Sequence, residues 1–226
     1  MSVSSAMEVV SSATVKTAAG GDAFRLVEMR YAETVATPFT MVLDLVSDQA
    51  DLDPDSLLGT PATVSFALPG GGQRHFSGLV AAVEQRTDKG DIHAYRLVVR
   101  PWIALLELGS DCRIFQNKKP ADIVKGVFDD LGFSDYSLSG LVGNYPELPF
   151  CLQYDESHLA FVERLMQRFG ISYHTEQSDG SHKLVFTDDP SSHKPFPGYD
   201  TIPYRAAADA SRSEEHIDSW TWRKRV

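Results

Sequence analysis

The sequence is poor in cysteine, in basic charge and in long hydrophobic runs. Its two cysteines, Cys112 and Cys151, are too few for a disulfide framework and lack the spaced pairs of a zinc site, which favours a reducing compartment. No apolar run approaches the roughly 20 residues of a membrane-spanning helix, and residues 1–20 lack the basic start and apolar block of a signal peptide. The formal net charge of -10, from 21 Lys and Arg against 31 Asp and Glu, argues against nucleic acid as a partner.

Strand patterns dominate the chain up to residue 100. Residues 1–22 are rich in Ser, Ala and Thr and are expected to form a partly ordered leader that can hold one strand. Beyond them apolar and polar side chains alternate, as in residues 39–45, and glycine-bearing turns at 70–72 and 88–90 separate the segments. Because no helical pattern intervenes, residues 23–100 are expected to form an antiparallel β-barrel or sandwich.

The pattern becomes mixed over residues 101–190, which we expect to form an α/β portion with two helices. A short helical turn is expected at residues 102–108. The first long helix begins at Pro120, whose missing amide costs nothing there, and ends at Gly132. Its apolar face has helical spacing and comprises Ile123, Val124, Val127, Phe128 and Leu131. Residues 134–149 show no clear period and are expected to form a loop.

The segment 151–190 predicts a strand, a helix and a hairpin in close succession. Asp155 or Ser157 can cap the helix by accepting a hydrogen bond from one of its first amides, and Gly170 suits a left-handed position at its end. The helix has an apolar face formed by Leu159, Val162, Leu165, Met166 and Phe169. The sequence Asp-Gly at 179–180 supplies the hairpin turn.

The last part of the chain returns to an extended pattern. Residues 191–212 contain three prolines and have no clear period, whereas strand character resumes from Ile217 to Val226. We therefore expect residues 191–226 to form a loop and a strand that returns to the first barrel or starts a second one. Because the chain stops within this pattern, the sequence is expected to be a fragment. The fold class expected is α+β, an antiparallel β-barrel followed by an inserted α/β portion with two helices.

Two histidines near the hairpin, His174 and His182, suggest a metal site that the strand register excludes. With a two-residue turn at 179–180, Gln177 lies opposite His182 and His174 lies opposite Val185. The two imidazoles then project from opposite faces of the hairpin and cannot share a metal ion.

Other pairs of reactive groups also fail to form a catalytic site. Cys151 belongs to a strand and His158 to the first turn of a helix, so a buried structural cysteine is expected. The adjacent acids at 155–156 and 188–189 diverge, unlike paired catalytic carboxylates. The glycines at 70–72 lack the Lys-Ser/Thr of a phosphate loop. No catalytic, cofactor-binding or metal-binding residue is therefore expected.

Several long blocks follow one another in an order that is typical of one family. They are PWIALLEL (101–108), RIFQNKKPADIV (113–124), NYP (144–146), CLQYDESHLAFVERLMQRFGISY (151–173) and HKLVFTDDP (182–190), with FSGLVAAVEQR (76–86) upstream. Together they resemble the VgrG family, the spike proteins of type VI secretion, whose hub region is similar to a contractile-phage baseplate hub. The resemblance extends over about residues 23–190.

The resemblance implies a structural, non-enzymatic role. In this family the hub region contains antiparallel β-barrels with an inserted α/β portion, and three subunits surround an axis. Such a homotrimer would couple the hexameric tail tube, Hcp, to a membrane-puncturing needle. Baseplate proteins are further expected partners, and a needle-tip protein and effectors would bind regions beyond Val226. The resemblance also implies assembly in the bacterial cytoplasm and delivery outside by the contractile apparatus.

Seven residues are candidates for interface or packing roles: Arg113, Phe115, Gln116, Gln153, Tyr154, Trp220 and Trp222. The first five belong to the blocks that carry the resemblance. They would lock the α/β portion onto the barrel or contribute to a subunit interface, and a core network inside one subunit is an equal alternative. The two tryptophans share one face of the last expected strand, where a neighbour or the ordinary core would cover them.

Two other functions stay open at this point. A hub protein of a phage or phage-derived contractile tail shares the region, and the sequence after Val226 would distinguish the two. A cell-wall hydrolase component is an alternative of another class, and its catalytic group would lie in an extension of the chain.

Overall fold

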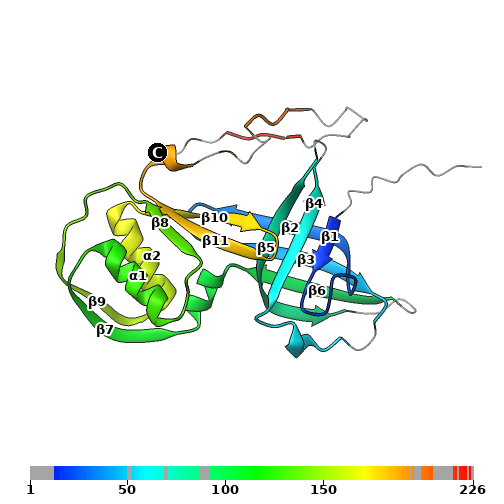
Figure 1. Ribbon diagram of the computed structural model, residues 1–226, viewed down its shortest axis with the longest axis horizontal. Helices are drawn as coiled ribbons and strands as arrows, with labels where there is room; N and C mark the ends of the chain where they lie inside the picture. The colour runs from blue at the N-terminus through cyan, green and yellow to red at the C-terminus, as the bar shows by residue number, and fades with distance from the viewer. Residues whose placement is uncertain are drawn as a thin grey trace, which may run out of the picture. The chain divides into compact units, whose positions relative to one another are not determined.

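The computed structural model describes residues 13–49, 52–68, 71–86, 92–193, 195, 200–205, 216–217, 219–222 and 224. The chain divides into two compact units, residues 1–189 and residues 190–226, and each is described by itself. The first unit carries the sheets and the helices α1 and α2 (Figure 1). No helix in the described part of the chain is long and apolar enough to cross a membrane.

An antiparallel sheet of six strands forms the N-terminal part of the first unit (Figure 1). Its strands are β1 (Ala13–Lys16), β2 (Arg25–Thr34), β3 (Thr37–Ser47), β4 (Pro61–Ala67), β5 (Gln73–Gln85) and β6 (His93–Arg100). They are ordered β1-β4-β5-β6-β3-β2, with a 3-10 turn, η1 (Pro54–Ser56), before β4. Register shifts in β2 and β5 mark bulges, and the sheet curls into a half-barrel. The antiparallel barrel expected from the sequence is thus observed as a six-stranded antiparallel half-barrel.

The inner face of the half-barrel is apolar because side chains alternate along each strand. In β3, Phe39, Met41, Leu43 and Leu45 are at most 1% exposed, which confirms the predicted parity of this strand. Residues from neighbouring strands complete the core, among them Val64, Val80, Tyr95, Leu97 and Val99. Each such side chain contributes roughly 1.5–3 kcal/mol on burial, so this face is the main stabilising element of the sheet.

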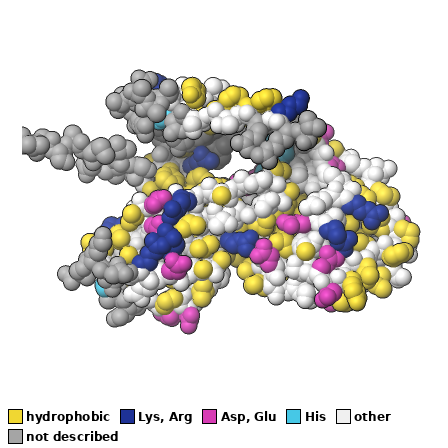
Figure 2. Space-filling view, turned by 180° about the vertical axis from the view of Figure 1, so that it is seen from behind, with side chains coloured by type: hydrophobic (Ala, Val, Ile, Leu, Met, Phe, Trp, Pro, Cys, Tyr) yellow, Lys and Arg dark blue, Asp and Glu magenta, His cyan; other side chains and the backbone are white. Residues whose placement is uncertain are grey.

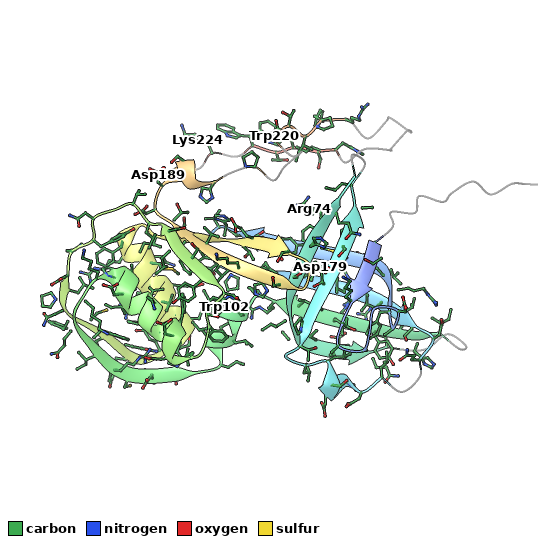
Figure 3. All side chains as sticks on the ribbon, in the orientation of Figure 1. Arg74, Trp102, Asp179, Asp189, Trp220 and Lys224 are labelled. Atoms are coloured by element: carbon green, nitrogen blue, oxygen red, sulfur yellow. The ribbon has the colours of Figure 1, made fainter. Side chains whose placement is uncertain are left out.

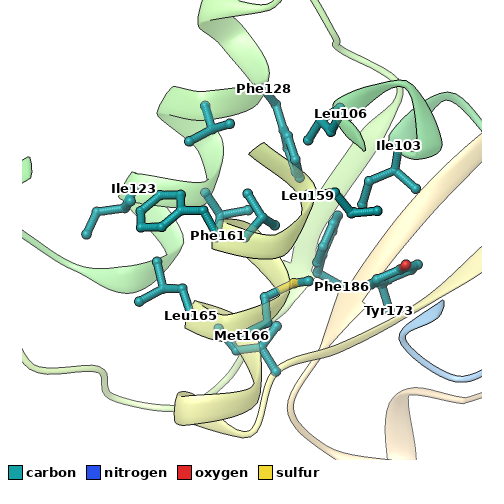
Figure 4. Close-up of a cluster of buried hydrophobic side chains, with 14 of the residues drawn as sticks. Ile103, Leu106, Ile123, Phe128, Leu159, Phe161, Leu165, Met166, Tyr173 and Phe186 are labelled. Atoms are coloured by element: carbon teal, nitrogen blue, oxygen red, sulfur yellow. The ribbon is translucent and has the colours of Figure 1, made fainter. Parts of the chain in front are cut away.

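An α/β part follows β6 within the same unit. Its elements are the 3-10 helix η2 (Trp102–Glu107), β7 (Ser110–Lys118), α1 (Pro120–Asp130), β8 (Tyr136–Gly140), β9 (Leu148–Ser157), α2 (His158–Phe169), β10 (Ser172–Ser178) and β11 (Ser181–Thr187). Strands β10, β11 and β8 form one sheet, and β7 and β9 form a separate antiparallel pair. Helices η2, α1 and α2 share an apolar core with β10 and β11 (Figure 4).

Helix α1 begins at Pro120, as predicted, and Gly132 follows it with a φ of 81°. Four residues of the predicted apolar face, Ile123, Val124, Val127 and Phe128, are at most 2% exposed. The prediction for Leu131 is wrong, because this residue is the C-cap of α1 and is 40% exposed. The helix ends before its next turn can bring Leu131 onto the buried face.

Helix α2 is capped by Ser157, whose Oγ accepts a hydrogen bond from the N–H of Ala160 at 3.1 Å. This decides between the two capping residues considered from the sequence. At the other end Gly170 has a φ of 67°, the left-handed conformation that was predicted for it. The apolar face also contains Phe161, which is fully buried and was missing from the predicted set.

The β10–β11 hairpin has the predicted register. Gln177 pairs with His182, and His174 pairs with Val185. The two histidines therefore belong to opposite faces of the hairpin, and His182 is buried at 7% exposure.

The loop expected over residues 134–149 is wrong in part. Strand β8 lies within this range, and β9 begins at Leu148. β8 has only five residues, too few for a clear alternation to appear in the sequence. Its strand conformation depends on parallel pairing with β11, where Tyr136 lies opposite Leu184. A contact between segments so far apart in the chain leaves no local signal.

The second unit begins with a 3-10 turn, η3 (Pro190–Ser192). A parallel bridge joins Tyr204 to Ile217, and the N–H of Arg205 donates to the carbonyl of Ile217 at 2.9 Å. A strand was expected from Ile217 to Val226. Among the described residues this bridge at Ile217 is the part of that strand that the structure shows, and Val226 is not among the described residues.

Candidate interaction surface

The antiparallel pair β7–β9 carries five of the seven residues proposed from the sequence. Arg113, Phe115 and Gln116 lie on β7, and Gln153 and Tyr154 lie on β9. The register places Arg113 directly opposite Gln153. Because side chains alternate along a strand, the five residues divide between an inner face toward the helices and an outer face.

Two of these residues pack on the inner face against α2. Phe115 is 8% exposed and stacks on Phe161, with ring centroids 5.5 Å apart and planes 9° apart. Gln153 is fully buried, and its Nε2 donates to the carbonyl of Glu156 at 3.1 Å. The same amide lies 3.2 Å from Nδ1 of His158. These contacts hold β9 against the N-terminal end of α2.

Arg113 connects β7 to the end of α1. Its guanidinium lies 5.0 Å from the ring centroid of Phe115, and its Nη1 donates to Oδ2 of Asp130 at 2.9 Å. Asp130 is the last residue of α1, where a carboxylate is unfavourable beside the partial negative charge of the helix terminus. The arginine offsets this repulsion. Arg113, Phe115 and Gln153 therefore make their contacts within the α/β part.

The opposite side of the same strand pair is apolar and uncovered. We call it the β7–β9 outer face, and it comprises Ile114, Gln116, Phe150, Leu152 and Tyr154. Phe150 is 73% exposed, Tyr154 70%, Ile114 64% and Leu152 43%. Ile114 lies directly opposite Leu152, and Gln116 opposite Phe150, so the side chains form one continuous surface. Figure 2 shows hydrophobic side chains gathered at this end of the α/β part.

Two distorted backbone positions bound the outer face. Asn117 has a φ of 49° and Asp155 a φ of 47°, which is unusual for residues other than glycine. The pairing register of β7 and β9 shifts between Asp111 and Arg113. Beside this shift the N–H of Asp155 donates a hydrogen bond to Sγ of Cys112 at 3.4 Å. Asn and Asp tolerate this conformation better than most residues, at a cost of about 1 kcal/mol. The strand pairing continues past both positions, to Lys118 opposite Leu148 and to Ser110 opposite Ser157.

The residues that join the six-stranded sheet to the β10–β11 hairpin were not among the sequence candidates. The N–H of Ser77 donates to Oε1 of Gln177 at 2.8 Å, and its Oγ donates to the carbonyl of Ser178 at 2.6 Å. Just after β6, the N–H of Trp102 in η2 donates to Nε2 of His182 at 2.9 Å, which ties η2 to the same hairpin. Each bond joins residues about 80 to 100 positions apart, so nothing local in the sequence marks them.

Further contacts reach the same hairpin from the sheet. The N–H of Ala36, at the turn between β2 and β3, donates to the carbonyl of Tyr173 at 3.0 Å. Lys16 of β1 forms an ion pair of 2.8 Å with Asp179 at the hairpin turn, where Figure 3 shows Asp179 beside the sheet. Because this pair is exposed and its attraction is screened by solvent, the bonds to the backbone dominate the junction.

A cavity of about 250 Å³ lies beside this junction. Leu79, Trp102, Phe133, Asp135 and His182 contribute to its wall. Burial lowers the pKa of His182 to about 4, so its imidazole is neutral at neutral pH. A neutral ring is what the bond from Trp102 requires, because Nε2 must be an acceptor.

The chemical groups near α2 do not form a nucleophilic site. Burial raises the pKa of the Cys151 thiol, the opposite of what a reactive thiolate needs. His158 faces the Gln153 amide through Nδ1. Among the described residues, no group of three or more His, Cys, Asp or Glu is placed to hold a metal ion.

Asp188 joins two of the sequence blocks named above. Its carboxylate accepts hydrogen bonds from the N–H of Val142 at 2.9 Å, from the N–H of Gly143 at 2.7 Å and from the hydroxyl of Tyr145 at 2.5 Å. Burial alone would raise the pKa of Asp188, but these donors outweigh it and lower the pKa. The segment between β8 and β9 is thereby fixed to the end of β11.

A curled antiparallel half-barrel with this α/β part defines an α+β protein of the phage-tail hub type. The chain belongs to the phage tail baseplate hub (GPD) family, which matches residues 32–226. The type VI secretion system spike protein VgrG1b of Pseudomonas aeruginosa is 40% identical over 207 residues, 92% of this chain and 28% of that protein. VgrG1c of the same organism is 38% identical over the same shares. The resemblance predicted from the sequence blocks is confirmed.

Solved structures show the same fold. One is an E. coli protein described as a type VI secretion component that is similar in structure to the T4 tail proteins gp27 and gp5. It aligns with a TM-score of 0.67 and 21% sequence identity, and the alignment covers 82% of this chain and 52% of that one. A tail protein from Neisseria meningitidis has a TM-score of 0.55 and 16% identity, covering 88% of this chain and 55% of that one. The chain spans about a quarter to a third of the length of the spike proteins VgrG1b, VgrG1c and VgrG1a that it matches.

Proposed function

We propose that this chain is the hub of a type VI secretion spike, in which three copies surround an axis and couple the Hcp tail tube to a needle. The observation that carries the proposal is the 40% identity to the spike protein VgrG1b across 92% of the chain. The family match over residues 32–226 supports the same structural role.

The contacts inside the first unit suit a part that transmits force. The half-barrel and the α/β part each have their own apolar core, and the hydrogen bonds of Ser77 to Gln177 and Ser178 join them. The ring of Phe39, from the core of the half-barrel, also meets His182 at 6.0 Å between centroids. Separating the two cores would break these hydrogen bonds, each of which contributes about 0.5–1.5 kcal/mol.

The partners follow from the same role. The assembled hub would contact Hcp at one end and baseplate proteins at its side. A needle-tip protein and effectors would bind parts of the spike outside the residues matched here. Such a hub would assemble in the bacterial cytoplasm and be delivered outside by the contractile apparatus.

We propose a role without enzymatic activity for this chain. The raised pKa of the buried Cys151 thiol supports this. A cell-wall hydrolase would instead show wall-degrading activity that Cys151→Ala abolishes.

The trimer is tested by producing the protein from its complete gene and measuring its mass by analytical ultracentrifugation, alone and with purified Hcp hexamer. The expected result is a mass of three chains and a further shift when Hcp is added. A folded protein that stays monomeric at micromolar concentration would refute the hub.

A hub of a phage-derived contractile tail is the second candidate, and the name of the matching family favours it. The two differ in the machine that carries them. In the type VI case, deletion of the Hcp gene should abolish release of the protein into the medium. Release that persists without Hcp would favour the phage-derived tail.

A further inference from the structure

We infer that the first unit contains a hinge at Arg100–Pro101, and that the β10–β11 hairpin is the latch that holds the half-barrel and the α/β part closed. The hairpin reaches from the α/β part to β5 of the sheet (Figure 1). We call this contact the hairpin seam. It joins Lys16, Tyr31, Ala36 and Ser77 of the half-barrel to Tyr173, Gln177, Ser178 and Asp179 of the hairpin.

Within the described part of the first unit, the chain passes between the two parts once. The half-barrel ends with β6 at Arg100, and the elements from η2 to β11 belong to the α/β part. Glu107, the last residue of η2, accepts hydrogen bonds from both Nη atoms of Arg100 at 2.8 Å and 3.2 Å, which keeps η2 beside the end of β6. A single covalent crossing lets two parts turn about it without unfolding either one, as hinges at the ends of elements do.

The two parts have separate apolar cores. Among the described residues, the buried cluster of the half-barrel and that of the α/β part share no side chain. From the half-barrel, Ala36 and Leu79 pack against the α/β core, and both are only half-buried. The rings of Phe39 and His182 add one edge contact. Opening the seam would therefore expose little apolar surface, whereas opening either core would expose much more.

Polar groups supply most of the contacts that hold the hairpin seam. Strand β6 pairs with β5 from Leu79 onward, so the N–H of Ser77 is not taken up by β6 and donates to Oε1 of Gln177 instead. Oγ of Ser77 donates to the carbonyl of Ser178, and Nε2 of Gln177 reaches the hydroxyl of Tyr31 at 3.4 Å. Water can replace each of these partners at a small net cost, because hydrogen bonds to water substitute for those within the protein.

Packing beside the seam is incomplete. The wall of the cavity of about 250 Å³ combines Gly78 and Leu79 of the half-barrel with Trp102, Phe133 and His182 of the α/β part. Well-packed interiors leave few gaps of this size, so the atoms that line it lack contacts that one continuous core would provide. The missing contacts lower the cost of opening at this place.

The latch gives the unit a closed ground state and an open state in which both cores stay intact. In the proposed hub this motion would let the α/β part tilt on the half-barrel under load before either core unfolds. That use rests on the proposed function, whereas the hinge rests on the contacts within this chain. Because the motion is measured on the chain by itself, its failure and the failure of the hub proposal are distinguishable.

Hydrogen exchange followed by NMR on the whole chain tests the hinge. The N–H groups of Ala36 and Ser77 belong to the half-barrel but donate to the hairpin, so these two seam amides report on the seam. Two core amides, those of Leu97 in β6 and Val162 in α2, report on the two cores. We expect the seam amides to exchange at least about tenfold faster than the core amides, and to share one protection factor because a single opening exposes both.

Gln177→Ala tests whether the seam opens as one piece. It removes the acceptor of the Ser77 amide but leaves the acceptor of Ala36, the carbonyl of Tyr173, in place. We expect the protection factor of Ala36 to fall by about threefold or more, because the weakened latch opens more often, while the core amides stay unchanged. The control is Glu176→Ala, which truncates the neighbouring exposed side chain on the opposite face of β10 and should leave all four amides unchanged.

Three results would overturn the inference. Equal protection of the seam amides and the core amides would show that the seam opens only when the whole unit unfolds. Different protection factors at Ala36 and Ser77 would show that the two bonds break separately. A Gln177→Ala variant that changes Ser77 and leaves Ala36 unchanged would show the same.

Discussion

The N–H of Trp102 donates a hydrogen bond of 2.9 Å to Nε2 of His182, so the first residue of η2 is tied to the second residue of β11. The imidazole must be neutral, with its proton on Nδ1, to accept this bond. Burial lowers the pKa of His182 to about 4, which keeps the acceptor available across the neutral range. This contact makes the attachment of η2 to the hairpin sensitive to acid.

Stability should fall between about pH 6.5 and pH 4 because of His182. The folded pKa of about 4 lies below the ordinary value of 6.5, so in this window the unfolded chain takes up a proton that the folded chain refuses. The contribution is complete above pH 6.5 and is lost toward pH 4, with a limit of about 3 kcal/mol. Urea unfolding at a series of pH values measures it. His182→Gln, which keeps a polar acceptor and does not titrate, should flatten the slope in this window.

Asp188→Asn should destabilise the segment between β8 and β9. The neutral amide replaces a carboxylate that accepts three hydrogen bonds, and one of its two positions becomes a donor facing an N–H group. We expect a loss of about 1–2 kcal/mol and faster amide exchange at Val142 and Gly143, measured by hydrogen–deuterium exchange. Asp22→Asn, at an exposed turn, is the control. Unchanged exchange in the Asp188 variant would contradict the prediction.

Gly78→Ala should destabilise the half-barrel. A Cβ at this position would lie 2.8 Å from the carbonyl oxygen of Arg100 and 2.8 Å from Cγ1 of Val99, so β5 and β6 would have to separate. We expect a loss of roughly 1–3 kcal/mol in chemical denaturation. In contrast, Gly126→Ala in α1 meets nothing within 4 Å and should stabilise the protein by about 0.5–1 kcal/mol. Equal effects of the two substitutions would refute the packing argument.

Ser157→Ala should cost about 1 kcal/mol, because the N–H of Ala160 loses its side-chain acceptor. Ser157→Asp keeps an acceptor and adds a charge that the helix N-terminus favours, so it should retain most of the stability. Thermal unfolding followed by circular dichroism compares the variants. A loss of the same size in both would show that the cap does not stabilise α2.

Much of the fold could be predicted because its signals are local. The helix ends at Pro120 and Gly170 follow from backbone constraints of single residues. The hairpin register follows from its two-residue turn, which places Gln177 opposite His182. Strand β8 was missed because its pairing partner lies in β11, beyond three intervening elements.

The candidate surface could be predicted only in part. The blocks that carry the family resemblance led to β7 and β9, but apolar residues occur on both faces of this strand pair. Phe115 and Phe150 have similar sequence signals, yet one is 8% exposed and the other 73%. Which face α2 covers depends on how the helix returns over the strands, and that is a property of the packed chain.

The sequence by itself determined the ends of the two helices, the register of the β10–β11 hairpin and the family that the chain resembles, since these depend on short segments and on their order. The tertiary structure alone decided that Ser77 and Trp102 bind the hairpin, and that Ile114, Phe150 and Tyr154 remain uncovered. These features arise from contacts between segments far apart in the chain. Their free energies appear only when both partners are brought together, so no local pattern encodes them.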